Sequence, residues 1–450
     1  MRVGIIGAGM MGLALAQRLT ARGLRVTLYD REGQAGGLST YHDYGGFTWD
    51  RFYHVILPTD SHLIGFLKEI GLGEGLRWGT MRTGLYANHR VYPVSTAFDL
   101  LRFPLVGLWG KLRLARAILA CKRVRDWRCL ETVSVEDWLV EMCGRRTYEL
   151  FWKPLLLAKL GEHYKRVSAV FIWSYVTRLF SVREGGTQRN QLGYVTGGYR
   201  TVIARLEELI RAGGGDIRLG TSVRSVRAGA DGRIIVEGEQ GHDQFDKVVW
   251  TGPVDAGSTL VRHGLVEVTS ATRPVEYLGV VCPVLVTRRP VLPYYTLNIA
   301  DRAVPFTGVI GMSSIVHPAE TDGRYLTYFP QYVLSDDLYL RQPDERVKEQ
   351  LFLGLRQLFP GLSTSDIVSL HINRAAKVQP LQVLEYSRVA PRISTAHRNV
   401  FILNSSQLVN CTLNNNEIIG AVDAFVSEHA SRFVSADSSR GRKLTAVLSH

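Results

Sequence analysis

The chain has 450 residues, 46% of them hydrophobic and 21% charged, which predicts two or three globular domains with a large core. Its formal charge of +13 favours anionic molecules such as nucleotides, phosphorylated or carboxylated substrates and anionic lipid surfaces. The arginines are dispersed and form no nucleic-acid reader motif, so nucleic acid is excluded as a partner. The 5 cysteines form no C-x-x-C pair and no zinc spacing with histidine, which argues against a metal site and favours the reducing cytoplasm. No apolar run approaches the ~20 residues that span a bilayer, so any contact with an anionic membrane is expected to be peripheral.

The first thirty residues have the pattern of a unit that binds the ADP half of a dinucleotide. A strand over 3–6 leads into the turn GAGMMG at 7–12, followed by a helix over 13–22 and a strand over 25–29. The second strand ends on Asp30, which is placed to accept hydrogen bonds from ribose hydroxyls. This unit alone does not separate NAD from FAD.

Each glycine of the turn has a different task in such a unit. Gly7 permits the tight turn, Gly9 lets the backbone approach the pyrophosphate, and Gly12 lets helix and strand pack closely. The free N–H groups at the start of the helix then face the phosphates. The residues expected to bind the ADP half are Gly7, Gly9, Met10, Met11, Gly12, Asp30 and Arg31.

Later segments alternate between helical, mixed and strand-rich patterns. Residues 60–190 are rich in helix patterns, whereas 193–260 return to α/β signals, including an amphipathic helix over Thr201–Ala212. Strand patterns dominate 275–335, and a helix is predicted over Asp344–Phe359. The chain then returns to a buried strand in NVFILNSS and a capped helix in NNNEIIGAVDAF.

Nucleotide-type pieces therefore occur at the start, middle and end of the chain, with different material between them. The economical arrangement is one discontinuous α/β domain with two inserts that form a second domain. The predicted nucleotide domain comprises 1–58, 190–260 and 370–434. The predicted substrate domain comprises 59–189 and 261–369, and 435–450 form a polar, flexible tail.

Four segments give the chain a resemblance to the FAD-containing amine oxidase and protoporphyrinogen oxidase superfamily, which includes phytoene desaturases and, more distantly, UDP-galactopyranose mutases. They are the turn at 7–12 with Asp30, the sequence GGLST at 36–40, the stretch GYVTGGYRTVIARLEELI with the later SVRSV, and the terminal NVFILNSS…NNNEIIGAVDAF. The resemblance implies an α/β fold: a discontinuous Rossmann-like FAD-binding domain with an inserted α+β substrate domain.

The resemblance also implies FAD rather than NAD, because an extended FAD needs protein along its full length. It adds a second set of cofactor contacts: Gly36, Gly37, Leu38 and Ser39 after the ribose acid, and Val223 at the adenine end. In FTWDRFYHVI, it makes Asp50 and His54 the polar residues near the flavin, with His54 the candidate that steers a proton. A buried, hydrogen-bonded core histidine is the alternative for His54.

The terminal segment departs from the family pattern. The family usually ends its last strand on a glycine and an acid that binds the ribityl chain, whereas Asn404 and Ser405 stand here. Both side chains can still hydrogen-bond a ribityl hydroxyl. Asn414 to Asn416 replace the usual glycine-rich helix start, and Asn416 is expected beside the flavin, where the N-terminal helix dipole favours negative charge.

Two further features keep two interpretations each. The segment Pro104–Arg125 mixes large apolar residues with six basic ones, which fits either a surface for anionic lipid or a domain-packing helix with solvated charges. The second interpretation is favoured, because the basic residues share no single helical face. Arg178 and Arg183 fit either a clamp for an anionic substrate or ordinary surface and interdomain ion pairs.

The predicted activity is that of an FAD-dependent oxidase or dehydrogenase. A small-molecule substrate, lipophilic or anionic, would give a hydride to flavin N5, with reoxidation by oxygen or another acceptor. The first alternative is a non-redox mutase that acts on a nucleotide-sugar. The second is a flavin-binding accessory protein without turnover.

Overall fold

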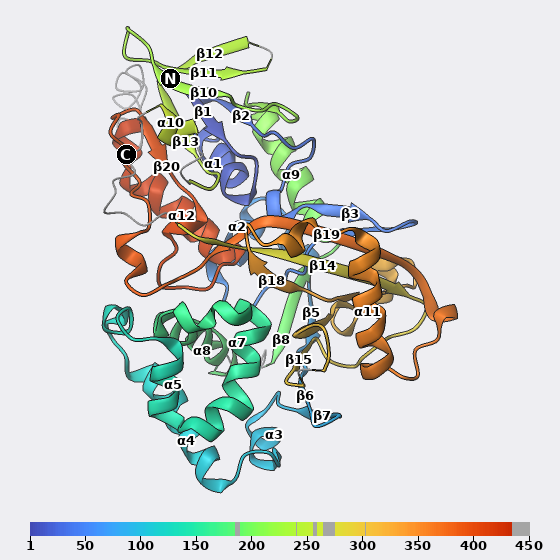
Figure 1. Cartoon of the computed structure of the whole chain (residues 1–450). Helices are drawn as coiled ribbons and strands as arrows, with labels where there is room; N and C mark the ends of the chain where they lie inside the picture. Colours follow the sequence, from blue (N-terminus) through green and yellow to red (C-terminus); the bar gives the residue numbers. More distant parts are fainter. Residues whose placement is uncertain (185–189, 240, 255–258, 264–274, 302, 434–450) are drawn as a thin grey trace, which may run out of the picture.

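A five-stranded parallel sheet forms one end of the molecule (Figure 1). The computed structural model describes residues 1–184, 190–239, 241–254, 259–263, 275–301 and 303–433. The strand order is β20-β13-β1-β2-β9, and every neighbouring pair is parallel. The strands are β1 (Arg2–Ile6), β2 (Arg25–Tyr29), β9 (Asp216–Arg218), β13 (Lys247–Trp250) and β20 (Val400–Ile402). Three distant parts of the sequence therefore build one sheet.

The two faces of this sheet are covered differently. Helices cover one face: α1 (Met10–Thr20), α9 (Tyr199–Ala212), α12 (Asn415–Glu428) and α2 (Ser61–Glu69) share one apolar core with β1 and β2. A three-stranded antiparallel sheet covers the other: β10 (Ser225–Ala228), β11 (Ile234–Gly238) and β12 (Gly241–Phe245). Gly4 of β1 faces this second layer, where a Cβ would lie 2.9 Å from the Phe245 ring. The fold is thus α/β, as predicted, and its nucleotide domain is discontinuous in sequence.

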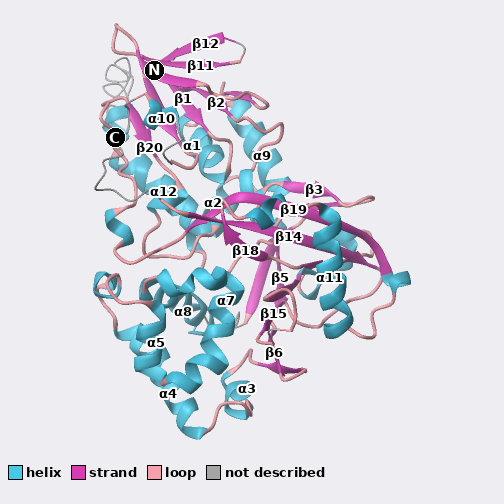
Figure 2. Ribbon diagram, in the orientation of Figure 1, coloured by secondary structure: helices cyan, strands magenta, loops and turns pink. Residues whose placement is uncertain are grey.

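The second large sheet is mixed, and Figure 2 shows it crossing the middle of the molecule. Its core is β14 (Tyr277–Thr287), all of whose residues are buried. One edge of β14 pairs with β17 (Tyr325–Tyr328) and β18 (Gln331–Leu334), and the other pairs with β19 (Ile367–Pro380). The sheet continues through β16 (Gly308–Gly311), β15 (Thr296–Ile299), β6 (Thr83–Ala87) and β7 (Arg90–Pro93), and α11 (Asp344–Leu358) packs on it.

A helical body forms the far end of the molecule (Figure 1). It contains α3 (Ala97–Arg102), α4 (Leu108–Arg123), α5 (Val135–Cys143), α6 (Arg145–Thr147), α7 (Lys153–Leu160) and α8 (Ala169–Glu184). A π-helical turn over Tyr148–Trp152 precedes α7. Pro154 in the first turn of α7 lacks an N–H group, which explains why the regular hydrogen-bond ladder is interrupted here.

The remaining strands and a short helix connect these parts. They are β3 (Tyr41–Asp43), β4 (Thr48–Asp50), β5 (Leu76–Thr80), β8 (Gln191–Val195) and α10 (Thr259–Arg262). β3 pairs with β4, and β5 pairs with β8. In the part of the chain that the structure describes, every helix is too short or too polar to cross a bilayer.

The structure moves two of the predicted domain boundaries. The predicted insert begins at residue 59, but α2 packs against α1 and α12 in the core of the parallel sheet. The predicted return to the nucleotide domain at residue 370 falls inside β19, which pairs with β14 along most of its length. An amphipathic pattern alone does not say which core a segment joins. Here α2 packs in the core of the parallel sheet, and β19 belongs to the mixed sheet. The tail predicted over 435–450 lies outside the described residues.

Candidate functional site

Two glycine segments meet at the carboxyl edge of the parallel sheet. In the turn after β1, the Gly7 N–H donates to Tyr29 O at 2.8 Å. Ala8 O, in the same turn, accepts the Gly36 N–H at 2.8 Å. Gly9 and Gly36 form an isolated parallel bridge. Gly37 has a φ of +58°, and a Cβ there would lie 3.0 Å from Gly9 Cα. The two motifs that the sequence predicted as parts of one cofactor site are therefore in direct contact.

The three glycines of the first turn differ in what surrounds them. A Cβ on Gly12 would lie 1.8 Å from Gly7 O, and one on Gly7 would lie 2.5 Å from Thr251 Oγ1. A Cβ on Gly9 would meet nothing closer than Gly37 Cα at 4.0 Å. Packing explains Gly7 and Gly12, but among the described residues no neighbour explains why residue 9 lacks a side chain. This open space beside the start of α1 fits the close approach of a pyrophosphate.

The N-terminus of α1 suits an anion. Gly9 is its N-cap, and among the described residues no side chain caps this end and no acid lies in its first turn. Met10 and Met11 are the first two residues of α1, and their side chains are buried in the protein. They can therefore offer only their backbone N–H groups to a ligand.

The end of β2 holds the carboxylate expected at the ribose. Asp30 Oδ2 accepts the Ala8 N–H at 2.6 Å, and Oδ1 accepts the Glu32 N–H at 2.9 Å. These two bonds fix the orientation of the carboxylate and leave further lone pairs for hydroxyl groups. Arg31, in contrast, is exposed and pairs with Glu32 at 3.2 Å.

The expected adenine-side segment runs next to this carboxylate. Thr221 N–H donates to Asp30 O at 2.7 Å, and Gly220 N–H donates to Glu32 O at 2.8 Å. Val223 follows before β10 begins, is half-buried, and packs with Trp250 on the core of the three-stranded sheet. Contact between Val223 and an adenine remains a prediction.

The GGLS segment also reaches the start of α12. Ser39 is buried and hydrogen-bonds Asn415, whose Nδ2 donates to Ser39 Oγ at 3.1 Å. Leu38 packs against the core that contains Tyr328. Two sequence motifs, from residues 36–39 and 414–416, are therefore joined by a side-chain hydrogen bond.

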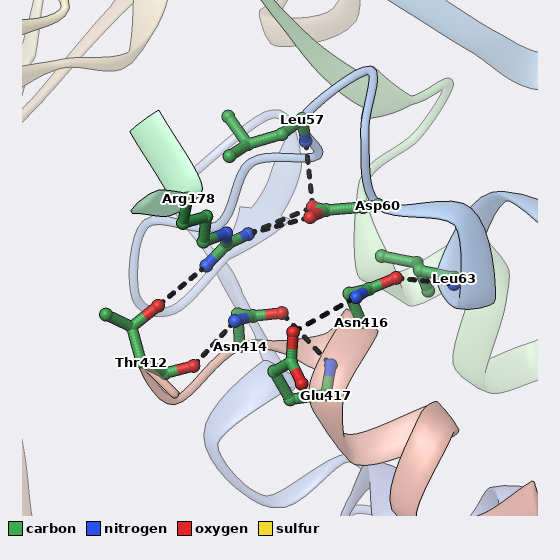
Figure 3. Close-up of polar contacts among 8 residues, drawn as sticks. All are labelled: Leu57, Asp60, Leu63, Arg178, Thr412, Asn414, Asn416 and Glu417. Carbon is green, nitrogen blue, oxygen red and sulfur yellow. Dashed lines mark hydrogen bonds and ion pairs between the residues drawn. The ribbon is translucent and has the colours of Figure 1, made fainter. Parts of the chain in front are cut away.

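Asn414 and Asn416 at the start of α12 have separate roles (Figure 3). Asn414 caps the helix, because its Oδ1 accepts the Glu417 N–H at 3.1 Å. Asn416 Oδ1 accepts the Leu63 N–H of α2 at 3.1 Å, so this side chain fixes α2 against α12. Asn416 was expected beside the flavin, and its side-chain oxygen is instead engaged by the protein.

Asn404 has a structural task that the sequence did not predict. Its side chain is buried and caps the turn Ser405–Gln407: Oδ1 accepts the Ser406 N–H at 3.0 Å, and Nδ2 donates to Gly252 O at 2.9 Å. Because this carboxamide also accepts from the Ser406 hydroxyl, little of it remains for a ribityl hydroxyl. Ser405 lies at the start of the turn and is half-buried.

Asp50 and His54 lie beside this junction. Asp50 is buried, and its Oδ1 accepts the Tyr199 N–H at 2.7 Å at the start of α9. Gly198 allows this approach, since a Cβ there would lie 2.7 Å from Asp50 Oδ1. His54 Nδ1 lies 2.9 Å from Phe52 O and 4.0 Å from Asp50 Oδ2, and its ring packs edge-on against Tyr199. Gly198, in the GG pair at 197–198, therefore makes room for the buried Asp50 carboxylate.

Burial shifts the pKa of each group in the direction that favours its uncharged form. It raises the pKa of Asp50 to about 7, partly offset by the Tyr199 N–H, and lowers the pKa of His54 to about 4. A neutral His54 bonded to Phe52 O carries its proton on Nδ1, which leaves Nε2 as an acceptor. His54 is therefore suited to accept a hydrogen bond, rather than to carry a proton or a positive charge near neutral pH.

Arg178 of α8 connects the helical body to the cofactor side (Figure 3). Its Nη2 lies 3.0 Å from Asp60 Oδ2, and its Nη1 donates to Thr412 Oγ1 at 3.2 Å. Asp60 is the N-cap residue of α2 and also accepts the Leu57 N–H at 2.8 Å. Of the two expectations for this arginine, the structure shows the interdomain ion pair. The side chain of Arg183 lies outside those that the structure describes.

A cluster of tyrosines with one lysine lies where the helical body meets the mixed sheet. Tyr53 Oη is 2.7 Å from Tyr332 Oη, and Lys159 Nζ of α7 donates to Tyr53 Oη at 3.3 Å. Tyr328 packs edge-on against Tyr53 and donates its hydroxyl to Asp50 O at 2.6 Å. We call Tyr53, Lys159, Tyr295, Tyr328 and Tyr332 the tyrosine–lysine cluster. No pattern in the sequence pointed to Lys159.

These elements define a class of protein: a doubly covered parallel sheet with an anion-ready helix start, a ribose-type carboxylate and an extended line of contacts to a second domain. This donor set fits a long dinucleotide such as FAD. Comparison with known proteins gives the family: residues 10–379 match the model described as flavin containing amine oxidoreductase. The chain belongs to this family, and its cofactor is FAD.

Individual relatives are distant. A hydroxysqualene dehydroxylase of Sinorhizobium fredii is 27% identical over 281 residues, 58% of this chain and 63% of that protein. A mitochondrial protoporphyrinogen oxidase of Nicotiana tabacum is 29% identical over 116 residues, 25% of this chain and 23% of that protein. The matches thus span less than two thirds of these relatives. The solved structure of reduced UDP-galactopyranose mutase superposes with a TM-score of 0.72 over 97% of each chain, at 16% sequence identity, which shows a shared fold.

Proposed function

We propose that this protein oxidises a small organic substrate by hydride transfer from a C–H or C–N centre. The substrate class that fits is an apolar molecule with an anionic or hydrogen-bond-accepting group. FAD supplies the acceptor for the hydride at its N5 atom when it is bound. The protein's part is to hold the cofactor, orient the substrate and exclude water.

We further propose which residues hold the cofactor. Asp30 would bind the ribose, and the start of α1 with the Gly9–Gly37 contact would hold the pyrophosphate. Ser39 and the first turn of α12 would lie along the flavin half, where the positive end of the helix dipole favours negative charge. Asn415 fits this role because it is buried at the start of α12 and donates a hydrogen bond to Ser39.

The observation that carries the substrate proposal is the tyrosine–lysine cluster. Its members come from three places: the loop after β4, the helical body and the mixed sheet. Burial raises the pKa of the Tyr53 and Tyr332 hydroxyls, so both keep their protons and can donate hydrogen bonds. Lys159 adds a positive charge among aromatic rings, with Nζ 5.4 Å from the centre of the Tyr53 ring. Such a set can bind the polar end of a molecule whose remainder is apolar.

His54 then has a defined part. It follows Tyr53 directly in the chain, and its ring packs edge-on against Tyr199. As a neutral imidazole with an Nε2 lone pair, it can accept a hydrogen bond from the hydroxyl or amine of a substrate and so orient it. Because its pKa is about 4, it does not retain a proton near pH 7, and the proton released with the hydride goes to water.

Replacing Lys159 tests this proposal. In Lys159→Met, which keeps the length but removes the charge, the substrate concentration that half-saturates anaerobic flavin reduction should rise about tenfold or more. Lys159→Arg should restore part of this loss, and Lys165→Met, an exposed lysine of the same helical body, should match the wild type. Unchanged saturation in Lys159→Met would show that substrate binds elsewhere.

The mutase alternative makes a different prediction. The shared fold with UDP-galactopyranose mutase does not decide between the two activities, because one fold hosts many functions. A mutase would turn over a nucleotide-sugar only after prior flavin reduction, with no net consumption of electrons.

A further inference from the structure

An exposed apolar surface lies on the first two helices of the helical body. Six of the eleven large apolar side chains that are exposed among the described residues belong to α3 and α4: Phe98 (57%), Leu101 (63%), Leu108 (70%), Trp109 (78%), Leu112 (54%) and Leu119 (51%). We call these six residues the α3–α4 face. We propose that this face binds the surface of an anionic lipid bilayer, with the protein seated on the membrane by these two helices.

The packing of α4 explains why this face is uncovered in the part of the chain that the structure describes. Leu114, Ala117 and Cys121 are buried and pack in the core of the helical body. Leu108, Leu112 and Leu119, at spacings of four and seven residues, form a second stripe on the same helix. A helix that only packs against its own domain needs one apolar stripe. The interpretation favoured from sequence, a domain-packing helix with solvated charges, explains the buried stripe of α4 but not its exposed leucines.

The charge around the face specifies the partner. Residues 97–125 contain seven basic side chains and one acidic side chain, so their formal charge is +6. Six of the seven basic residues are exposed: Arg102, Arg113, Arg116, Lys122, Arg123 and Arg125. A basic surface with exposed leucines and a tryptophan matches an anionic bilayer, whose headgroups attract the charges while the interface accepts the apolar groups.

A shallow depression of about 420 Å³ adds a place for a lipid headgroup. It is lined by Arg116 and Arg123 of α4 and by apolar groups that include Leu119, Val124 and Met142. Two guanidinium groups beside an apolar floor suit a phosphate with its acyl chains attached.

The two helices act as one surface. Lys111 of α4 donates to Leu101 O at the end of α3, and the Arg102 guanidinium lies 4.1 Å from the centre of the Phe98 ring. Figure 1 shows α3 and α4 at the end of the molecule opposite the parallel sheet, so a bilayer at this end would not obstruct the proposed cofactor site. This inference is independent of the substrate proposed above.

Flotation of the FAD-loaded full chain with vesicles tests the proposal. We expect binding to phosphatidylcholine vesicles that contain phosphatidylglycerol, weaker binding to phosphatidylcholine alone, and loss of binding as salt is raised. Trp109→Ser with Leu112→Ser, and separately Arg116→Glu with Arg123→Glu, should each lower the bound fraction about tenfold.

Matched controls separate this surface from general stickiness. Leu338→Ser with Leu353→Ser removes two equally exposed leucines (77% and 61%) from the region of α11 and should bind as the wild type does. All variants should keep the flavin spectrum and unfolding temperature of the wild type, since the changed side chains are exposed.

Three results would overturn the proposal. The first is no binding to either kind of vesicle, and the second is binding that the two α3–α4 variants leave unchanged. The third is a doubled mass in light scattering without lipid that Trp109→Ser with Leu112→Ser abolishes, because the face would then cover a second copy of the chain.

Discussion

Gly9→Ala separates the two reasons for which a glycine can occupy the turn after β1. Gly9 has a φ of −69° and a ψ of 177°, which alanine adopts without strain, and the new Cβ would meet nothing closer than 4.0 Å. Apoprotein stability should therefore stay the same or rise by about 0.4–1 kcal/mol, as for other Gly→Ala changes at compatible positions. In the holoprotein, the same methyl group would occupy the space assigned to the pyrophosphate. Overpacking of about 1–3 kcal/mol corresponds to an FAD dissociation constant raised about 5- to 150-fold.

Gly12→Ala is the matched contrast. Its Cβ would lie 1.8 Å from Gly7 O, a backbone atom that cannot rotate away, so the apoprotein itself should lose about 3 kcal/mol or more. The assay pairs denaturant unfolding of the apoproteins with FAD titration followed by flavin fluorescence. The reasoning is refuted if Gly9→Ala binds FAD as tightly as the wild type, or if Gly9→Ala destabilises the apoprotein as much as Gly12→Ala does.

Three further predictions concern the charged and titratable groups of the site. Because the folded pKa of Asp50 is raised to about 7, its ionisation destabilises the fold as pH rises from 4 to 7, so Asp50→Asn should gain up to about 4 kcal/mol relative to the wild type over that range. Because the folded pKa of His54 is lowered to about 4, its protonation destabilises the fold at low pH, and the wild type gains stability as pH rises from 4 to 6.5. His54→Asn lacks this gain and should lose up to about 3 kcal/mol relative to the wild type over that range. Unfolding curves in which the two variants change in the same direction relative to the wild type would contradict both assignments. Arg178→Met should cost about 3–5 kcal/mol by leaving Asp60 buried without its ion partner, and added Asp60→Asn should recover at least half of this in thermal unfolding. If the double variant is no more stable than Arg178→Met, the ion pair is not the source of the loss.

Local motifs predicted the cofactor half of the fold well. The glycine turn, Asp30 and the helix over 199–212 follow from spacing and periodicity, which a nucleotide-binding unit imposes on contiguous residues. The contact between Gly9 and Gly37 was predicted as a shared site, and the structure brings the two segments together.

Roles that depend on distant partners were not predictable in this way. Asn404 and Asn416 look like cofactor ligands in a linear sequence, yet Gly252 and Leu63 take up their hydrogen-bonding groups. Lys159 belongs to a helix with no distinguishing pattern, and only the docking of that helix onto the mixed sheet places it beside Tyr53. The sequence also cannot show that α4 has a second, uncovered apolar stripe, because both stripes have helical spacing.

Substrate-dependent reduction of the bound FAD tests the central proposal most directly. The holoprotein is mixed without oxygen with a porphyrinogen, an isoprenoid, an amine and a nucleotide-sugar, while the visible absorbance of the flavin is followed. A hydride-accepting oxidoreductase should bleach with one of the first three, with one two-electron product formed per flavin reduced. Rearrangement of the nucleotide-sugar by pre-reduced protein, with no bleaching by the other three, would contradict the proposal.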